Sequence, residues 1–560
     1  MPRSAGDDSV TPAGTVVTRV ARAAGPVALW VVPALFVVVL FAWPVIALVR
    51  RAVTIARDSG VGLIELLDRT DALGLLGVTL GQAAASTVLA LVAAAPIAWL
   101  FARVRGTTAV VLAVVVTVPF VLPTVVVGVA FRSLLSGPLA FLHIESGLPA
   151  VLAAHMFINI AVVVRVVGAA WRNLDPRLLE AARSLGAGRI RATMTVVVPR
   201  LVPATASAAA LIFLFCSTSF GVVIILGAGE LRTLETEIYT QAIGYFRIPE
   251  AVALSMLQIV VVMAALLLTR VFADPASRGS GGGARRAERN RRVAGGRWTR
   301  PVVWVVGAWT AVLLVGPVLV LMVRSVRPVA HGDWTLAGYR ALAEPVNGVT
   351  PLESLRYSLV TATAATAIAL VVGTLAAVAL HRAHGVVGAI GSAVSLIPLG
   401  ISAVTLGFGY LIVLASLPYE IAASPAVIPL VQALIAIPVV IRIMMPALES
   451  VPVRLRHAAA TLGATPFRVF ATVDLPIVGR SMGAAGGFAF VMALGEFGAT
   501  SFLARADTTT LPVLIGSALN RPGAENLATA MAASVVLVIA TVVAVVVVEA
   551  FRPRSEVPLL

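Results

Sequence analysis

Long apolar segments alternate with short polar segments along the whole chain. A first set lies near 26–49, 78–101, 108–135, 148–171, 203–226 and 251–273, and a second set near 301–323, 357–380, 387–415, 424–448, 481–504 and 527–551. Each segment is long enough to cross a bilayer as a helix, which takes about 20 apolar residues. The pattern predicts an all-α polytopic membrane protein with about twelve transmembrane helices, some of them broken where prolines interrupt a segment.

The second set of segments repeats the first. Thr79-Leu80 matches Ser358-Leu359, Pro119 matches Pro398, Phe220-Gly221 matches Phe497-Gly498 and Thr233-Leu234 matches Thr510-Leu511, at an offset of 277–279 positions. Because each set holds an even number of spans, both halves insert the same way up. We expect two parallel six-helix repeats, residues 1–273 and 301–560, related by a pseudo-twofold axis along the membrane normal. The Arg- and Gly-rich stretch 274–300 is predicted to be a flexible cytoplasmic linker.

Composition supports a place in the membrane. The chain is 59% hydrophobic and 12% charged, with a mean hydropathy of +1.00, so it has too little polar surface for water. All 42 basic residues are Arg, and the net charge is +16. The Arg residues cluster in loops between spans, so they indicate contact with membrane lipid and not with nucleic acid.

The Arg-rich loops also predict orientation. Positive loops face the cytoplasm, so the linker and both termini of this multi-pass plasma membrane protein are expected on that side. The loop after the first span departs from this trend with Arg50, Arg51, Arg57 and Arg69, although acids dilute their charge. The run 26–49 is too long for a signal peptide, and we expect it to be retained as a span.

One repeated polar motif lies in a predicted cytoplasmic loop of each half. Its first copy comprises Glu180, Ala181, Ala182, Gly186 and Pro199, and its second copy comprises His457, Ala458, Ala459, Gly463 and Pro476. Asp175-Pro176 signals a helix start, and Leu178, Leu179, Ala182 and Leu185 recur at helical spacing before the glycine. Two copies at fixed spacing favour a docking element for a partner protein over a helix lying on lipid.

The motif resembles the E-A-A-x3-G-x9-I-x-L-P signature of permease subunits of binding-protein-dependent ABC importers. The resemblance covers essentially the whole chain, as two fused permease units. It implies that the motifs seat in two copies of a cytoplasmic ATP-binding subunit, and that a solute-binding protein acts outside the membrane. Glu180 would anchor the first seat. Because His457 replaces this Glu in the second copy, the two docking sites are expected to differ in strength.

Two further pairs of stretches resemble particular members of this family. Thr218–Gly221 with Thr233–Tyr239, and Gly495–Gly498 with Thr510–Pro512, are similar to fused permeases for thiamine and for ferric iron. The resemblance implies thiamine as the solute, with ferric iron as the alternative. An ion-coupled secondary transporter is the alternative of another class, since six-plus-six parallel repeats occur there too. That class would need several buried acids, and Glu496 is the clear candidate.

Acidic residues suggest two further sites. Intramembrane acids are costly and usually face a partner or a pathway. Glu496 is therefore predicted to line the pathway or gate opposite Ser217, Thr218 and Ser219, and the equal alternative is a structural partner for an Arg or a helix end. The outer loop with Glu230, Glu235, Glu237 and Glu250 either receives a solute-binding protein or is ordinary solvated surface.

The sequence gives little support for catalytic activity or for a metal site on this chain. A phosphate-binding loop of the G-x4-G-K-[ST] type requires Lys, which the chain lacks. We therefore expect no enzymatic activity and no bound cofactor on this chain, with ATP and Mg held by the partner ATPase. The six His residues show no metal-ligand spacing, although His381 and His384 share a helix face and are interpreted as an interfacial cap. Cys216, the single cysteine, is predicted to be a small buried side chain.

Overall fold

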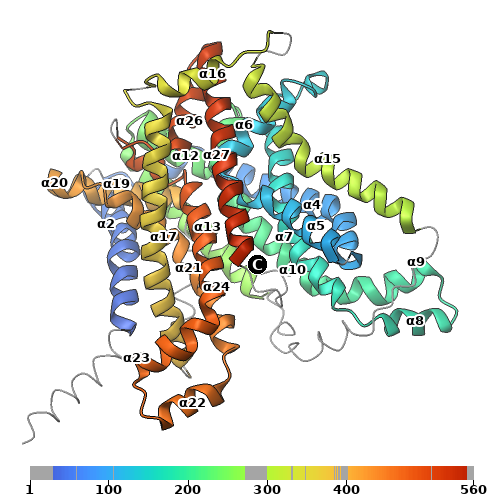
Figure 1. Ribbon diagram of the computed structural model, residues 1–560. Helices are drawn as coiled ribbons and strands as arrows, with labels where there is room; N and C mark the ends of the chain where they lie inside the picture. The colour runs from blue at the N-terminus through green and yellow to red at the C-terminus, as the bar shows by residue number, and fades with distance from the viewer. Residues whose placement is uncertain are drawn as a thin grey trace, which may run out of the picture.

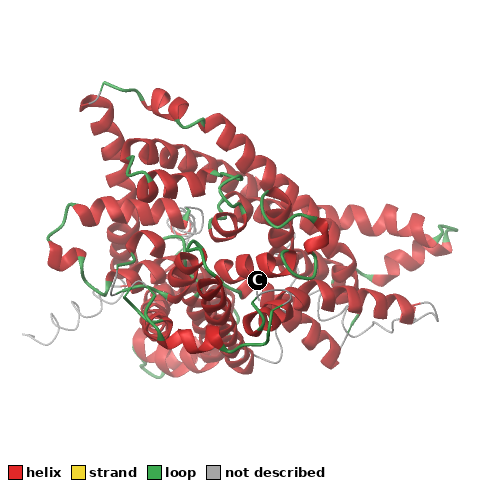
Figure 2. Cartoon of the chain, turned by 90° about the horizontal axis from the view of Figure 1, so that it is seen from above, coloured by secondary structure: helices red, strands yellow, loops and turns green. Residues whose placement is uncertain are grey.

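The computed structural model describes residues 29–271, 299–383 and 402–551, apart from 59, 105, 329–331, 347 and 506–507, and it also describes residues 385, 388 and 391. The described part is helical, with loops and one isolated bridge between Val346 and Val349 (Figures 1 and 2). The predicted linker lies outside the described residues, except for its last two positions, and so does most of the stretch 387–401.

Ten helical stretches are long and apolar enough to cross a membrane within the described ranges. They are Leu29–Asp58 (with η1, Val38–Ala42, and α2, Trp43–Asp58), α4 (Ala72–Arg103), α7 (Leu148–Arg172), Ile190–Ser217 (ending in α10, Val198–Ser217), α13 (Ile248–Val271), α15 (Thr299–Val326), α17 (Pro351–Arg382), α21 (Val427–Glu449), Pro466–Leu494 (ending in α24, Leu475–Leu494) and α27 (Ala524–Phe551). α19 (Ala403–Ala415) is the described part of the predicted segment 387–415. The predicted all-α fold is confirmed.

A further span is broken. The predicted segment 108–135 consists of α5 (Gly106–Val121) and α6 (Thr124–Leu135), which meet at an angle of 99°. Pro123 lies at the break with an extended ψ of 134°. Proline lacks an N–H and disfavours helical geometry in the residue before it, so the helix ends there. The predicted interruption of a span by proline is therefore confirmed at this position.

The internal repeat extends to the backbone. At an offset of 277 positions, α8 (Pro176–Ser184) matches α22 (Val453–Thr461), α9 (Arg189–Ala192) matches α23 (Pro466–Val469), η3 (Thr193–Val197) matches η8 (Phe470–Asp474) and α10 matches α24. The elements η3 and η8 are π-helical turns, a rare structure that is often tied to function. The recurrence of this π-helical turn at equivalent positions shows that the two halves have the same local structure. The boundaries at 273 and 301 stay predictions.

The first span of each half packs against the other half. α2 contacts α19 of the second half, and α15 contacts α6, the equivalent helix of the first half (Figure 1). Gly409 permits the close approach of α19, because a Cβ there would meet the carbonyl oxygen of Pro44 at 3.0 Å and the side chain of Leu48 at 3.2 Å. The Tyr410 hydroxyl donates a hydrogen bond to the Leu40 carbonyl. Each first span also contacts the last span of its own half, α13 or α27.

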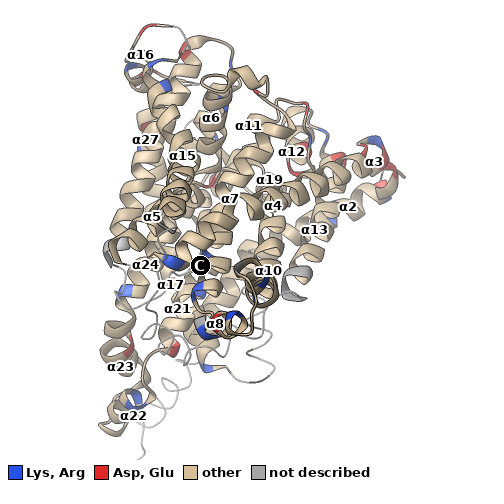
Figure 3. Ribbon diagram, turned by 90° about the vertical axis from the view of Figure 1, so that its right-hand side faces the viewer, with Lys and Arg blue, Asp and Glu red and all other residues tan. Residues whose placement is uncertain are grey.

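The polarity of the surface matches a bilayer. Charged residues gather toward the two ends of the helices and leave an apolar band between them (Figure 3). Large apolar side chains such as Trp304, Val312 and Val543 are exposed on long helices, where lipid would cover them. Inside, fully buried alanines such as Ala83 and Ala369 line the long helices α4 and α17. Small residues at such contacts allow membrane helices to approach closely.

Candidate functional site

The two predicted docking elements lie at the same end of the molecule. α8 and α22 project beyond the apolar band, at the end opposite α16 (Ala337–Arg340) (Figures 1 and 3). Each element continues through a short helix and a π-helical turn into a long span, α10 or α24. Pro199 and Pro476 lie in the first turn of these spans, where the missing N–H of proline is harmless. From α9 or α23 onward, the chain is continuously helical into the long span.

The glycines of the motif end both docking helices in the same way. Gly186 and Gly463 have φ angles of +86° and +81°, in the left-handed region that favours glycine. The N–H of Ala187 donates to the Ala182 carbonyl at 3.1 Å, and the N–H of Ala464 donates to the Ala459 carbonyl at 3.1 Å. This is the hydrogen-bond pattern of a glycine helix terminus. The predicted helix end at each glycine is confirmed.

Both loops expose large apolar side chains at equivalent positions. Leu185 is 89% exposed and Leu462 88%, while Ile190 and Phe467 are both 78% exposed. Leu185, which continues the helical spacing of Leu178, Leu179 and Ala182 in the sequence, lies just after the last residue of α8, and its side chain faces solvent. Exposed apolar groups in a polar loop are typical of a protein-binding surface.

The other motif residues surround these apolar groups. Glu180, Ala181, His457 and Ala458 are exposed, whereas Ala182 and Ala459 are half-buried. The Glu180 carboxylate, predicted to anchor the first docking site, and the His457 imidazole at the equivalent position are thus both accessible to a partner. Their effect on docking strength stays a prediction.

The two loops differ in how they are held. In the first loop, the Asp175 carboxylate accepts a hydrogen bond from the Arg177 N–H at 3.0 Å and caps α8. In the second loop, Pro452 precedes α22 and provides no side-chain cap. A buried ion pair fastens the second loop instead, because Arg456 Nε donates to Asp474 Oδ1 at 2.7 Å.

Arg456 makes two further contacts. It donates to the Leu448 carbonyl at 2.9 Å, and its third nitrogen lies 2.9 Å from His381 Nε2. Arg456, Asp474 and His381, called the Arg456 anchor below, join α22, η8 and α17. The first half has Leu179 and Val197 at the positions equivalent to Arg456 and Asp474. His381 lies in the last turn of α17 and contacts Arg456, and His384 lies outside the described residues, so the interfacial cap stays a prediction.

Aromatic side chains close the interface between the halves. Phe220 and Phe497, equivalent residues of the two repeats, stack with ring centroids 5.3 Å apart and planes 22° apart. Tyr239 lies 5.2 Å from Phe220 and 5.3 Å from Phe502 by ring centroids. We call Phe220, Tyr239, Phe497 and Phe502 the aromatic seam. Because equivalent residues meet at it, the seam lies on the pseudo-twofold axis, where a pathway between the halves would run.

The residues predicted to form the pathway or gate lie next to this seam. Ser217 and Thr218 donate to the Leu214 carbonyl at 2.9 and 3.0 Å, and Ser219 Oγ lies 2.8 Å from His155 Nε2. These polar side chains therefore bond within the first half. Cys216 is buried, as predicted.

Glu496 acts as a helix cap in this structure. Its carboxylate accepts hydrogen bonds from the N–H groups of Ala499 and Thr500 at 2.8 and 2.9 Å, at the start of α25 (Thr500–Leu503). Burial raises the pKa of Glu496, which lies between spans, and these N–H groups oppose the shift. The structure therefore favours the alternative interpretation, a partner for a helix end, and the gate role stays a prediction.

Glu235 is the acid that the sequence did not reveal as an interface residue. It lies on α12 (Leu234–Tyr239) and is fully buried. Gln258 Nε2 donates to its Oε1 at 2.6 Å, and the Ser402 hydroxyl of the second half donates to its Oε2. Burial raises the pKa of this carboxyl, which lies outside the long spans, to about 8, and both hydrogen bonds oppose the shift.

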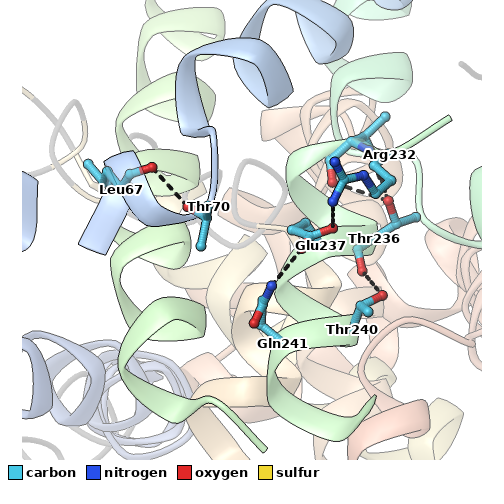
Figure 4. Close-up of polar contacts among 8 residues, drawn as sticks. Leu67, Thr70, Arg232, Thr236, Glu237, Thr240 and Gln241 are labelled. Atoms are coloured by element: carbon cyan, nitrogen blue, oxygen red, sulfur yellow. Dashed lines mark hydrogen bonds and ion pairs between the residues drawn. The ribbon is translucent and has the colours of Figure 1, made fainter. Parts of the chain in front are cut away.

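The predicted acidic docking loop is therefore wrong for two of its residues. Glu235 faces the interface between the halves, and Glu237 is buried, with Gln241 Nε2 donating to it at 2.7 Å and Arg232 3.6 Å away (Figure 4). Glu230 remains exposed. The signal that could have corrected the prediction is the pair Thr233 and Thr236, because it caps the start of a helix where a loop was assumed.

Comparisons with known proteins agree with this arrangement. Residues 86–274 match the family described as "Binding-protein-dependent transport system inner membrane component". The thiamine transport system permease protein ThiP of Brucella abortus is 26% identical over 78% of this chain and 80% of its own length. ThiP of Escherichia coli is 25% identical over 68% of this chain and 69% of its own length. The molybdenum transport system permease protein ModB of Azotobacter vinelandii is 33% identical over 30% of this chain and 79% of its own length.

The chain belongs to the family of binding-protein-dependent transport system inner membrane components, the permease subunits of ABC importers. It is a multi-pass protein of the plasma membrane and works with ATP-binding and solute-binding components.

Proposed function

We propose that this chain is the permease of a thiamine importer. The relatives that align with most of its length are thiamine permeases. The stretch Gly495–Gly498 followed by Thr510–Pro512, which resembles the thiamine and iron group, supports the same assignment. Ferric iron is the alternative solute, and an ion-coupled secondary transporter is the alternative of another class.

One ATP-binding subunit docks on each loop, so two copies bind per chain. The observation that carries this proposal is the matched pair of exposed apolar groups, Leu185 with Ile190 and Leu462 with Phe467, at one end of the molecule. ATP and Mg belong to these partners, and this chain contributes no catalytic residue. The solute-binding protein docks at the opposite end. No nucleic acid is involved, and lipid surrounds the apolar band.

The Arg-rich loops support an orientation in which the docking end faces the cytoplasm together with both termini. ATP binding then draws the two ATP-binding subunits together, and the docking loops move with them. The motion passes through η3 and η8 into α10 and α24. The halves rock about the pseudo-twofold axis and part at the aromatic seam, which opens the passage outward. Hydrolysis restores the closed form.

Uptake of labelled solute tests the assignment. In a strain that lacks this chain, we expect loss of thiamine uptake and unchanged uptake of ferric ion, with thiamine uptake restored by the gene on a plasmid. Loss of ferric uptake alone would instead identify an iron permease. Thiamine movement by the purified chain in liposomes without any ATP-binding subunit would contradict the ABC mechanism and support the secondary transporter.

A further inference from the structure

The hydrogen bond between Glu235 and Ser402 exists on one side of the pseudo-twofold axis only. The positions equivalent to Glu235 and Ser402 in the opposite halves are Pro512 and Pro123. α12 contacts α19, and the equivalent helices α26 (Leu511–Leu519) and α6 also contact each other. The positions that hold a carboxyl and a hydroxyl at one junction therefore hold prolines in the other copy. The fold therefore does not require an acid at this place.

Glu235 lacks a basic partner. Among the described residues, the ion pairs join Arg69 with Glu65, Arg232 with Glu237 and Arg456 with Asp474, and none includes Glu235. A buried acid without a cation is costly, and such residues within membrane proteins commonly serve a substrate or an ion. Because Glu235 lies between the halves, where a pathway would run, the solute is a candidate partner for its side chain.

Two hydrogen-bond partners from different halves contact the Glu235 carboxyl, whose raised pKa favours the protonated form until a cation approaches. Gln258 belongs to the same half as Glu235, whereas Ser402 belongs to the other half. The Ser402 hydroxyl accepts hydrogen bonds from the N–H groups of Val404 and Thr405 at 3.1 and 3.2 Å, which directs its proton toward Glu235. When the halves separate, Ser402 withdraws with α19 and Gln258 remains. One carboxylate oxygen then loses its donor and faces the opened passage.

Aromatic rings lie beside this carboxylate. Tyr239 follows Glu235 by four positions on the same helix, so both side chains are on one face. The Tyr239 ring contacts Phe220 and Phe502 in the aromatic seam. A cation is attracted both to a carboxylate and to the faces of aromatic rings. A flat cationic ring would fit this combination better than a metal ion, since Glu235 supplies the site with a single carboxylate.

We propose that Glu235, Tyr239 and the Phe220–Phe497 stack form a binding site for a planar organic cation that opens when the two halves separate. This inference rests on the proposed function, because thiamine carries a positively charged thiazolium ring. Ser402 occupies the carboxylate in the closed state, and the solute replaces it in the open state. Closure then returns Ser402 to Glu235 and expels the cation.

Glu235→Gln tests the site, and Glu237→Gln is the matched control. Both changes remove one buried acid from α12, but the polar partners of Glu237, Arg232 and Gln241, belong to the same half (Figure 4). The assay measures binding of labelled thiamine to the permease with its ATP-binding subunits in nanodiscs, locked open with a non-hydrolysable ATP analogue. The quaternary thiazolium ring has no N–H donor, so Glu235 would attract it by charge, and removing that charge should weaken binding by about tenfold to a hundredfold. We expect this loss in Glu235→Gln and wild-type affinity in Glu237→Gln.

Two further measurements separate a site from a folding defect. Recovery of the assembled complex with its ATP-binding subunits reports folding, and we expect wild-type recovery for both acid variants. Tyr239→Leu keeps an apolar side chain and removes the ring, so its thiamine affinity should fall by about fivefold if a cation–π contact contributes. A neutral isostere with thiophene in place of thiazolium should bind wild type and Glu235→Gln equally.

The outcomes distinguish the inference from the proposed function. Wild-type affinity in both Glu235→Gln and Tyr239→Leu overturns the site, while thiamine uptake by the wild type leaves the proposed function intact. Equal weakening by Glu235→Gln and Glu237→Gln also overturns it. A wild-type complex that neither takes up nor binds thiamine overturns the thiamine assignment and the site together.

Discussion

At the scale of single residues, Gly186 and Gly463 explain why the docking motif contains a glycine. Both have positive φ, and a Cβ at either position would meet no atom within 4 Å. The requirement for glycine therefore comes from backbone conformation and not from crowding. The two small residues before it, Ala182 and Ala459, supply the carbonyls that the helix terminus uses.

Replacing these glycines should weaken docking in proportion to backbone strain. A left-handed alanine costs about 1–2 kcal/mol, a factor of about 5–30 in an equilibrium constant. We expect Gly186→Ala and Gly463→Ala each to lower the affinity for the ATP-binding subunit by up to this factor, measured by titration in detergent. Gly186→Asn and Gly463→Asn are the controls, since asparagine tolerates this conformation, and they should bind more tightly than the alanine variants. Equal affinity for all four variants would contradict the explanation.

Residue-scale prediction from sequence succeeded where local geometry decides and failed where tertiary contacts decide. The helix ends at Gly186 and Gly463 follow from local backbone rules, and the sequence predicted them. Glu235 appeared to be a surface acid, because its partner Ser402 is 167 positions away. Glu496 was recognised as a buried acid, but its contacts with the N–H groups of α25 depend on a turn that no periodic pattern reveals.

At the scale of elements, the two docking loops have different side chains at equivalent anchoring positions. The first loop has Leu179 and Val197 at the positions where the second loop holds Arg456 against Asp474. Arg456 also contacts His381 on α17 and Leu448 on α21. The second loop is thereby fixed to two spans besides the one that it leads into, so its motion should be transmitted even if His457 docks more weakly than Glu180.

Conversion of the Arg456 anchor into the apolar pair of the first loop tests this comparison. Arg456→Leu alone leaves Asp474 buried and unpaired, which costs about 3–5 kcal/mol. We expect a lower unfolding temperature and a loss of solute-stimulated ATP hydrolysis. The double variant Arg456→Leu with Asp474→Val reproduces the pair found in the first loop and should recover most of the stability. A double variant no more stable than the single one would show that the ion pair does not anchor the loop.

Helical elements were predictable to the extent that they are long and apolar. The predicted segments 148–171 and 357–380 correspond closely to α7 and α17. The predicted segment 481–504 was placed too late, because its helix begins in the polar docking loop and already ends at Leu494. Apolar periodicity marks the part of a helix inside the bilayer and gives no signal for its polar extension into water.

At the scale of the whole molecule, the halves interlock through their first spans. α2 contacts α19 and α15 contacts α6, so neither half is a complete packing unit alone. Leu48 on α2 is fully buried, and Gly409 of the second half forms part of its surroundings. Sequence analysis predicted the repeat and its axis but not this exchange, because apolar periodicity does not specify the neighbour of a helix.

Separate expression of the halves tests the interlock. Residues 1–273 and 301–560, produced together as two chains, should co-purify and bind ATP-binding subunits, because the contacts between them do not depend on a covalent connection. Each half produced alone should be degraded or aggregate, since Leu48 or the surface of α6 then lacks its cover. Stable, monodisperse halves in isolation would contradict the interlock.

The contacts of α2 also constrain how the molecule can open. α2 is held to the second half by the close approach of Gly409 to Pro44 and Leu48, and the Tyr410 hydroxyl donates to the Leu40 carbonyl in the same helical stretch. We expect a helix held in this way to move with the second half. Because α15 contacts α6 in the equivalent way, the two bodies that rock about the axis would each carry the first helix of the other half.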